Sequence, residues 1–391
     1  MNPSKTPSVR FKGYEDEWEE RKLGELASFS KGNGYTKNDL VEFGDPIILY
    51  GRLYTKYETV IEKVDTFVNK KDNSIISEGS EVIVPASGES SEDISRASVV
   101  GKSGLILGGD LNIIKPVNYI DSIFLALTIS NGSQQQEMSK RAQGKSVVHL
   151  HNSDLKQVNL LYPKLEEQQK IGSFFKKLDN TISLHQRKLN LLNEQKKGFL
   201  QKMFPKNGEI IPEIRFAGFN DDWEERKLKD VVEKQIKGKA QFEKLARGDV
   251  EYLDTSRLNG GQAILTNGLK DVTLDDILIL WDGSKAGTVY HGFEGALGST
   301  LKAYRTSANS KFVYQYLKRH QDNIYNNYRT PNIPHVQKDF LNVFTISVPG
   351  SDEQAKIGSF FKKLDDTIAL HQRKIDELKS MKKSMLQKMF V

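Results

Sequence analysis

Two segments of the sequence carry apolar residues at alternating spacings of three and four, the pattern of a long helix with a coiled-coil seam. The segments are residues 166–204 and 352–390, and each fills two core rows over five heptads. Each helix needs a partner, because about a dozen apolar side chains left in water cost several kcal/mol. The rows are Ile171, Leu178, His185, Leu192, Phe199 and Phe175, Ile182, Leu189, Lys196, Met203 in the first segment. They are Ile357, Leu364, His371, Leu378, Met385 and Phe361, Ile368, Ile375, Lys382, Met389 in the second.

The sequence outside the two long helices predicts two mixed α/β domains. Short β-branched runs bounded by Gly and Asn clusters indicate strands within 78–88 and 275–284. A helix is predicted near 120–142 in the first domain and near 310–328 in the second, each followed by a loop and a strand that runs to a proline. The fold class that we predict is therefore α+β, with four segments: 1–165, 166–204, 205–351 and 352–391.

The chain is an internal duplication. The stretch KIGSFFKKLD occurs at 170–179 and again at 356–365, and 27 of 39 positions are identical around it at an offset of 186. RFKGYEDEWEERKL at 10–23 matches RFAGFNDDWEERKL at 215–228 in 10 of 14 positions. The sequence between these anchors diverges, so we expect one fold that is used twice with different surfaces.

The simplest partner for each long helix is the other copy in the same chain. An antiparallel pair makes a pseudo-two-fold internal repeat with one globular domain at each end. Such a pair brings His185 and His371 near the axis, where polar core residues fix the register of a coiled coil. A register key is the favoured interpretation of these histidines, and a metal site or a pH switch is the alternative.

The length of the helices suggests a spacer. A helix of 39 residues is roughly 58 Å long, and one turn of B-DNA is roughly 34–36 Å. Two domains on a rod of that size can address one face of DNA about one turn apart. Unlike domains would then read two unlike half-sites separated by an unread gap.

Composition narrows the class of protein without deciding it. The 391 residues include no cysteine, which excludes a disulfide framework and thiolate chemistry. The net charge of +6 divides into −2, +4, +1 and +3 over the four predicted segments, so the excess lies in the helices. Global charge is thus poor evidence for DNA binding, and only local patches can supply it. The sequence shows neither a signal peptide nor an apolar run that could span a bilayer, so we expect a cytoplasmic protein.

The apparent catalytic and metal-binding motifs of the sequence are incomplete or have a more favoured structural explanation. Two GKS triplets, at 101–103 and 144–146, lack the earlier glycine of a P-loop, since Arg96 and Ser139 stand at that position. His149 and His151 have metal-ligand spacing, but a loop role is favoured. We predict no catalytic residue, no metal site and no cofactor bound by this chain.

Several motifs together resemble the specificity subunit of a type I restriction–modification enzyme. They are the two WEERKL openings, the two KIGSFFKKLD helices, YGRLYTKYE at 50–58 and WDGSKAG at 281–287, and they cover nearly the whole chain. The resemblance implies two target recognition domains, each reading one half of a bipartite asymmetric sequence in double-stranded DNA. It also implies two modification (methyltransferase) subunits and restriction (translocase and nuclease) subunits as partners. Those partners would use S-adenosylmethionine, ATP and Mg²⁺.

Polar and basic loop residues are the candidates for contact with DNA, since such side chains read base edges and hold phosphates. In the first domain they are Lys31, Asn33, Tyr35, Arg52, Tyr54, Lys56, Gln143, Lys145 and His149. In the second domain they are Lys237, Lys239, Arg257, Asn259, Lys285, Asn327, Arg329, Asn332 and His335.

Four apolar residues of the long helices lie outside both core rows: Phe174, Leu184, Phe360 and Leu370. We predict that they bind the modification subunits, and packing on the adjoining domains is the alternative. Two other functions stay open. The near-neutral domains are compatible with an assembly scaffold that binds only proteins, and a nuclease is a more distant possibility.

Overall fold

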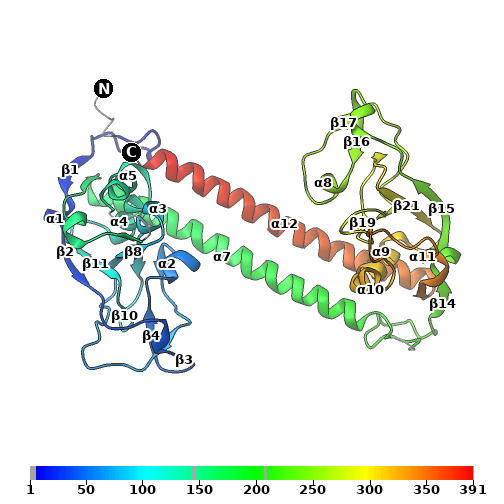
Figure 1. Cartoon of the computed structure of the whole chain (residues 1–391), viewed down its shortest axis with the longest axis horizontal. Helices are drawn as coiled ribbons and strands as arrows, with labels where there is room; N and C mark the ends of the chain where they lie inside the picture. Colours follow the sequence, from blue (N-terminus) through cyan, green and yellow to red (C-terminus); the bar gives the residue numbers. More distant parts are fainter. Residues whose placement is uncertain (1–5, 143–146, 207–208, 391) are drawn as a thin grey trace. The chain divides into compact units, whose positions relative to one another are not determined.

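The computed structural model describes residues 6–142, 147–206 and 209–390 (Figure 1). The chain divides into two compact units. Unit 1 comprises Met1–Gln186 and Arg373–Val391, and unit 2 comprises Arg187–Gln372. Each unit thus holds one globular domain and one stretch of each long helix. Within the described ranges, no helix is both long and apolar enough to cross a membrane.

Two sheets form most of the globular domain of unit 1. One has five strands in the order β2-β11-β7-β9-β5, and the other has four in the order β10-β4-β6-β3. The strands are β1 (Glu19–Lys22), β2 (Ala27–Lys31), β3 (Leu40–Val41), β4 (Asp45–Ile48), β5 (Val60–Ile61), β6 (Phe67–Val68), β7 (Val82–Pro85), β8 (Ser87–Gly88), β9 (Ser98–Val100), β10 (Ile106–Leu107), β11 (Leu111–Pro116), β12 (Val148–His149) and β13 (Asn159–Tyr162). The helices are α1 (Leu23–Leu26), η1 (Lys37–Asp39), α2 (Arg52–Thr55), α3 (Ser91–Ile94), α4 (Ser122–Ile129), α5 (Gly132–Arg141), α6 (Asn152–Leu155) and the start of α7 (Leu165–Lys202).

The globular domain of unit 2 repeats this plan with fewer strands. Its sheets have the orders β15-β21-β18-β19, β17-β16-β20 and β14-β22. The strands are β14 (Glu224–Lys227), β15 (Val232–Lys237), β16 (Arg247–Leu253), β17 (Leu265–Thr266), β18 (Ile277–Leu280), β19 (Val289–His291), β20 (Ala296–Leu297), β21 (Leu301–Thr306) and β22 (Thr345–Val348). The helices are η2 (Leu228–Val231), η3 (Phe242–Lys244), α8 (Thr255–Leu258), α9 (Ser310–Arg319), α10 (Gln321–Asn327), α11 (Phe340–Val343) and the start of α12 (Ser351–Met389).

The central strands of the two domains correspond residue by residue. Antiparallel β2, β11 and β7 in unit 1 have the same order as β15, β21 and β18 in unit 2. Gly32 and Gly238 follow the first strand of each set, and a Cβ on either would lie 1.9 Å from a carbonyl oxygen. Only glycine fits such a close approach of two backbones. The duplication read from the anchors therefore extends into the divergent middles.

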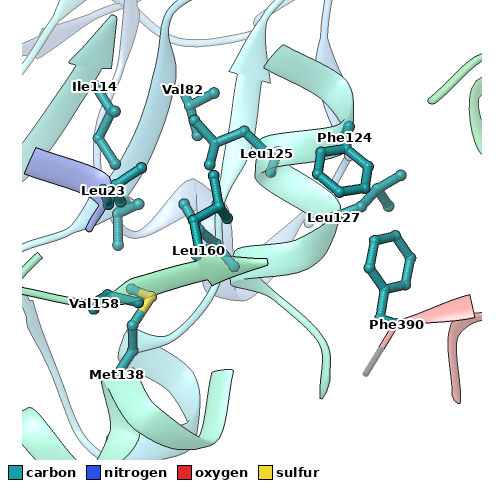
Figure 2. Close-up of a cluster of buried hydrophobic side chains, with 14 of the residues drawn as sticks. Leu23, Val82, Ile114, Phe124, Leu125, Leu127, Met138, Val158, Leu160 and Phe390 are labelled. Carbon is teal, nitrogen blue, oxygen red and sulfur yellow. The ribbon is translucent and has the colours of Figure 1, made fainter. Parts of the chain in front are cut away.

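The core of unit 1 gathers the apolar faces of the sheet and the helices. Leu23, Val82, Ile114 and Phe124 are fully buried in it, and Phe390, which follows α12, lies beside Phe124 (Figure 2). The two rings of Phe124 and Phe390 have centroids 5.9 Å apart. Unit 2 has the equivalent arrangement, in which Phe204 packs on Phe312 at 5.6 Å. In both units the aromatic residue after the end of a long helix completes a domain core.

The stretches of α7 and α12 within each unit run antiparallel, as predicted (Figure 1). In unit 1 Asp179 pairs with Lys382 at 2.5 Å, and in unit 2 Lys196 pairs with Asp365 at 2.6 Å. Lys196 and Lys382 are polar members of the predicted core rows, as His185 and His371 are, and the carboxylates of the repeated KKLD stretch bind the two lysines. These pairs fix the register, because a shift by one heptad would leave each half-buried charge without its partner.

The first turn of each long helix is fastened to its domain by two repeated residues. Arg10 forms a bidentate ion pair with Glu167, and Arg215 forms the same pair with Glu353, both at 2.9 and 2.7 Å. The next residue, Gln168 or Gln354, donates its amide to the carbonyl of the preceding proline. These contacts explain why the sequence EQ is retained in both copies.

One local prediction needs correction. Each single helix predicted after the strands is two helices, α4 and α5 in unit 1 and α9 and α10 in unit 2. In unit 1 the break falls at Ser130 and Asn131, directly before Gly132, whose φ is +69°. In unit 2 it falls at His320, whose ring Nδ1 lies 2.9 Å from the carbonyl oxygen of Tyr316.

Candidate nucleic-acid interface

Several loops of unit 2 meet around one hollow of about 470 Å³. Lys237 reaches it from the end of β15, and Lys302 from the neighbouring strand β21, because the two residues face each other in the antiparallel register. Trp281 follows β18, and His335 lies across a β-bridge from Asp282. The full lining is Gln235, Lys237, Trp281, Asp282, Ser299, Leu301, Lys302, His335 and Lys338.

The floor of the hollow is a lysine held on an aromatic ring. The Nζ atom of Lys302 lies 3.2 Å from the centroid of the Trp281 ring, and Trp281 is only 8% exposed. A cation over an indole face is attracted by the ring quadrupole. Burial lowers the pKa of Lys302, and Lys237 lowers it further while Asp282 raises it. The ring thus fixes a cationic donor at a defined point.

His335 is also held in one orientation. Its Nδ1 atom lies 3.0 Å from the carbonyl oxygen of Ile333, and the hydroxyl of Thr330 lies at the same distance. Because a carbonyl only accepts hydrogen bonds, Nδ1 donates in this contact. The predicted residues Lys237 and His335 therefore meet in one site.

Two other predicted arginines of unit 2 are engaged in holding loops. Arg329 donates to the carbonyl oxygens of Tyr325 and Ser284, at 2.7 and 3.0 Å. Arg257 forms an ion pair with Glu251. Both guanidinium groups hold loops through these partners, and their contact with DNA stays a prediction.

The remaining predicted residues of unit 2 lie on the surface outside the lining of the hollow. Two of them use their amides locally, since Asn259 donates to the carbonyl oxygen of Thr255 and Asn327 to the side chain of Asn323, both at 2.6 Å. The others are exposed: Lys239, Lys285 and Asn332. They remain candidates for contact with phosphates.

Three predicted residues of unit 1 take part in its internal structure. The side chain of Arg52 is 8% exposed and pairs with Glu58 at 2.6 Å and Asp65 at 2.8 Å. Tyr35 is buried, and its hydroxyl accepts from the backbone of Lys71. The hydroxyl of Tyr54 donates to the carbonyl oxygen of Ser87 at 2.6 Å, and burial raises its pKa. Tyrosine and arginine in a loop sequence are ambiguous, because the same donors serve a partner in the fold or a ligand.

Four predicted residues of unit 1 keep accessible side chains. Lys31, at the end of β2, and His149 are exposed, and His149 stacks on His151 with a centroid distance of 6.3 Å. Asn33 donates to the carbonyl oxygen of Asn73, and Lys56 forms an exposed ion pair with Asp65. The last two predicted residues, Gln143 and Lys145, lie outside the described residues. Across the described part of the chain, no group of three or more His, Cys, Asp or Glu residues could hold a metal ion.

The strand registers show which positions of the two domains are equivalent. Lys31 faces Asn112 as Lys237 faces Lys302. The position that Trp281 occupies after β18 belongs to Ala86 after β7, and His149 pairs with Ser87 as His335 pairs with Asp282. Asn112 is fully buried and donates to the carbonyl oxygen of Leu150 at 2.8 Å. The same backbone positions thus carry different chemistry in the two units.

The four off-seam apolar residues fall into two pairs. Phe174 packs on Phe11 and Phe360 on Phe216, each at 5.9 Å, so both rings are covered within their own units. These contacts agree with the packing alternative, and the contact of the two rings with a partner stays a prediction. Leu184 and Leu370 are 66% and 58% exposed and remain candidates for that role.

The fold and the site together define a class of protein: one mixed α/β fold used twice on long helices, with a basic, aromatic-floored hollow in unit 2. The sequence matches the family model described as type I restriction modification DNA specificity domain over residues 15–194 and 220–380. The chain belongs to this family. The resemblance stated from the motifs is therefore confirmed, and the alternatives of a protein-binding scaffold and a nuclease receive no support.

Individual relatives agree with the family. The chain is 31% identical to the type I restriction enzyme MjaVIII specificity subunit of Methanocaldococcus jannaschii over 192 residues, which are 46% of this chain and 45% of that protein. It thus spans about half the length of that relative. It is 24% identical to the putative type I restriction enzyme MjaX specificity subunit of the same organism, over 76% of this chain and 74% of that protein.

A solved structure supports the predicted fold class. The S subunit of a type I restriction-modification system from M. genitalium superposes with a TM-score of 0.73 and covers 99% of both chains at 16% sequence identity. At this identity the likeness concerns the fold alone. The α+β class with two domains and paired long helices is confirmed.

Proposed function

We propose that this protein is the non-catalytic DNA-recognition subunit of a type I restriction–modification complex. It reads a bipartite, asymmetric target in double-stranded DNA and positions the methyltransferase and restriction subunits there. The observation that carries this proposal is that Asn112 and Lys302 occupy the same position in the shared backbone fold of the two domains. One frame with two sets of side chains suits a target made of two unlike half-sites.

The proposal assigns a role to each segment of the chain. The two target recognition domains are residues 1–165 and 205–351, and the long helices are 166–204 and 352–391. Two modification subunits bind S-adenosylmethionine, and restriction subunits use ATP and Mg²⁺, while this chain binds no cofactor. The names of the relatives support such a complex. The protein acts in the cytoplasm, where the DNA is.

The exposed leucines of the long helices are the proposed contacts with the modification subunits. Leu184 belongs to unit 1 and Leu370 to unit 2, and each lies outside the seam of its helix. Replacing either with Glu should leave the fold intact and weaken co-purification with the modification subunit. Undiminished co-purification of the doubly substituted protein would remove these residues from the docking surface.

The decisive experiment is a genome-wide map of N6-methyladenine in cells that carry this chain with its modification subunit. Cells that lack only this chain are the control. A split motif that disappears with the chain supports recognition by this subunit. Unchanged methylation would overturn the proposal.

A domain exchange then tests the modular reading. Residues 24–150 are replaced by the equivalent segment of another member of the family, and the methylated motif is mapped again. One half of the motif should change while the other half stays the same. A change in both halves would contradict independent recognition by the two domains.

The complex should also bind duplex DNA in a salt-dependent way, because contacts with phosphates release counterions. The logarithm of the binding constant should fall linearly with the logarithm of the salt concentration. Replacing the exposed Lys239 with Gln should reduce that slope slightly and leave the sequence preference unchanged.

A further inference from the structure

We propose that Lys302, held on the ring of Trp281, is the specificity-determining residue of the second domain and that it reads a guanine in the half-site of that domain. The inference rests on the proposed function and deepens it. It names the side chain that makes the second domain recognise a different half-site from the first, and the base that this side chain prefers.

The first argument is that Lys302 has no anionic partner among the described residues. Some partly buried cations of the described chain are paired with carboxylates, as Arg215 is with Glu353 and Lys196 with Asp365. For Lys302 the described residues provide the ring face of Trp281 and no carboxylate within ion-pair distance. A partly buried ammonium group is costly unless something compensates its charge. Its position is explained if a ligand supplies the acceptors.

The second argument is the setting of the hollow. Lys237 and Lys338 are exposed at its edge, where flexible ammonium groups can meet phosphates. Lys302 lies deeper, on a rigid aromatic floor, where it cannot follow the backbone of any sequence equally well. An immobile donor discriminates between bases, whereas mobile donors at a rim contribute affinity without sequence preference.

The third argument concerns the base. An ammonium group has three donors and no acceptor, and guanine presents two adjacent acceptors, O6 and N7, in the major groove. Adenine and cytosine place an amino group there, which would face the ammonium group unfavourably. The equivalent Asn112 of unit 1 is buried and its amide is bonded within the fold, so the first domain cannot use this mode of reading.

The test is a set of substitutions in the intact complex with its modification subunit. Lys302→Gln removes the cation, Lys302→Arg restores a donor that suits guanine, and Lys285→Gln is the control for charge at an exposed lysine outside the hollow. The readout is the N6-methyladenine map of each variant. Lys302→Gln should relax one guanine position of one half-site by roughly 5- to 150-fold, which corresponds to a discrimination of about 1–3 kcal/mol.

The variants separate the possible outcomes. In the Lys302→Arg variant the guanine preference should persist, and in the Lys285→Gln variant every position should be weakened equally and only slightly. If Lys302→Gln fails to fold, the Lys302→Arg map still decides, because a lost guanine preference with a folded protein contradicts the proposal.

Two results would overturn different claims. If the unaltered complex shows no split motif that depends on this chain, the proposed function fails. If it shows one, and Lys302→Gln leaves both half-sites unchanged, recognition stands and the assignment of Lys302 fails. A half-site of the second domain that contains no guanine would also overturn the assignment.

Discussion

The ion pair between Arg215 and Glu353 gives the sharpest prediction about stability. The two side chains are 11% and 2% exposed and make two parallel hydrogen bonds of 2.9 and 2.7 Å. Glu353→Ala leaves a guanidinium group without its partner, and breaking a buried pair in this way costs about 3–5 kcal/mol. Because Arg215 retains a bond to the carbonyl oxygen of Asp221, we expect the lower end, about 3 kcal/mol.

Hydrogen exchange followed by mass spectrometry measures this effect locally. A loss of about 3 kcal/mol corresponds to roughly a 100-fold faster opening, and it should appear in peptides from 215–228 and 351–361. The matched variant Glu167→Ala removes the equivalent pair with Arg10, and its effect should appear in unit 1. A double variant, Arg215→Met with Glu353→Leu, should regain most of the loss, since an apolar pair of similar volume avoids the buried charge.

An acceleration below about 5-fold in the Glu353→Ala variant would show that the pair contributes no more than an exposed salt bridge. Equal acceleration in both units would show that the pair does not act locally. Either result would refute the reasoning that these repeated residues fasten each helix to its own domain.

Three further predictions concern single contacts. Burial raises the pKa of Asp276, but hydrogen bonds from Arg305 and Thr273 lower it more, so that it lies below the ordinary value of 3.8. The stabilisation of unit 2 by this carboxylate is therefore complete above pH 3.8. It is lost as the pH falls through the pKa of the folded state. Asp276→Asn should flatten this acid limb in a pH series of urea midpoints, and an unchanged limb would exclude Asp276 as its source. Phe390→Ala should cost unit 1 about 3–5 kcal/mol, measured by exchange in peptides around Trp18, and a slowed or unchanged exchange there would contradict the packing. Asp365→Asn should cost unit 2 about 1 kcal/mol in urea unfolding, since the carboxylate is partly exposed, and a midpoint equal to that of the unaltered protein would assign the register of α12 to apolar packing alone.

The sequence predicts the long helices well because their periodicity is local. The sequence also placed Lys196 and Lys382 in the core rows, although it did not show their carboxylate partners. The partners lie on the other helix, at a distance along the chain that periodicity cannot register. The duplication favoured the antiparallel arrangement without deciding it, and the structure adds the residues that hold it.

The candidate site was predicted less completely. Lys237 and His335 were named from their loops, but Lys302 and Trp281 were missed, since they lie in or directly after strands and meet only through strand pairing. The ion pair of Arg52 could not be predicted, because its carboxylate partner Asp65 stands 13 residues away in a loop of no recognisable pattern.

The division of the chain into units has a consequence for biosynthesis. Unit 2 is one continuous stretch, whereas unit 1 needs Phe390 and the last turns of α12 to close its core over Trp18 and Phe124. The ribosome adds about 200 residues after the first domain, which takes roughly 10–40 s. The domain that emerges first is therefore completed last, and until then it exposes the apolar surface that Phe390 will cover. A premature stop codon in the final turns of α12 would leave the second domain intact and damage the one at the opposite end of the gene.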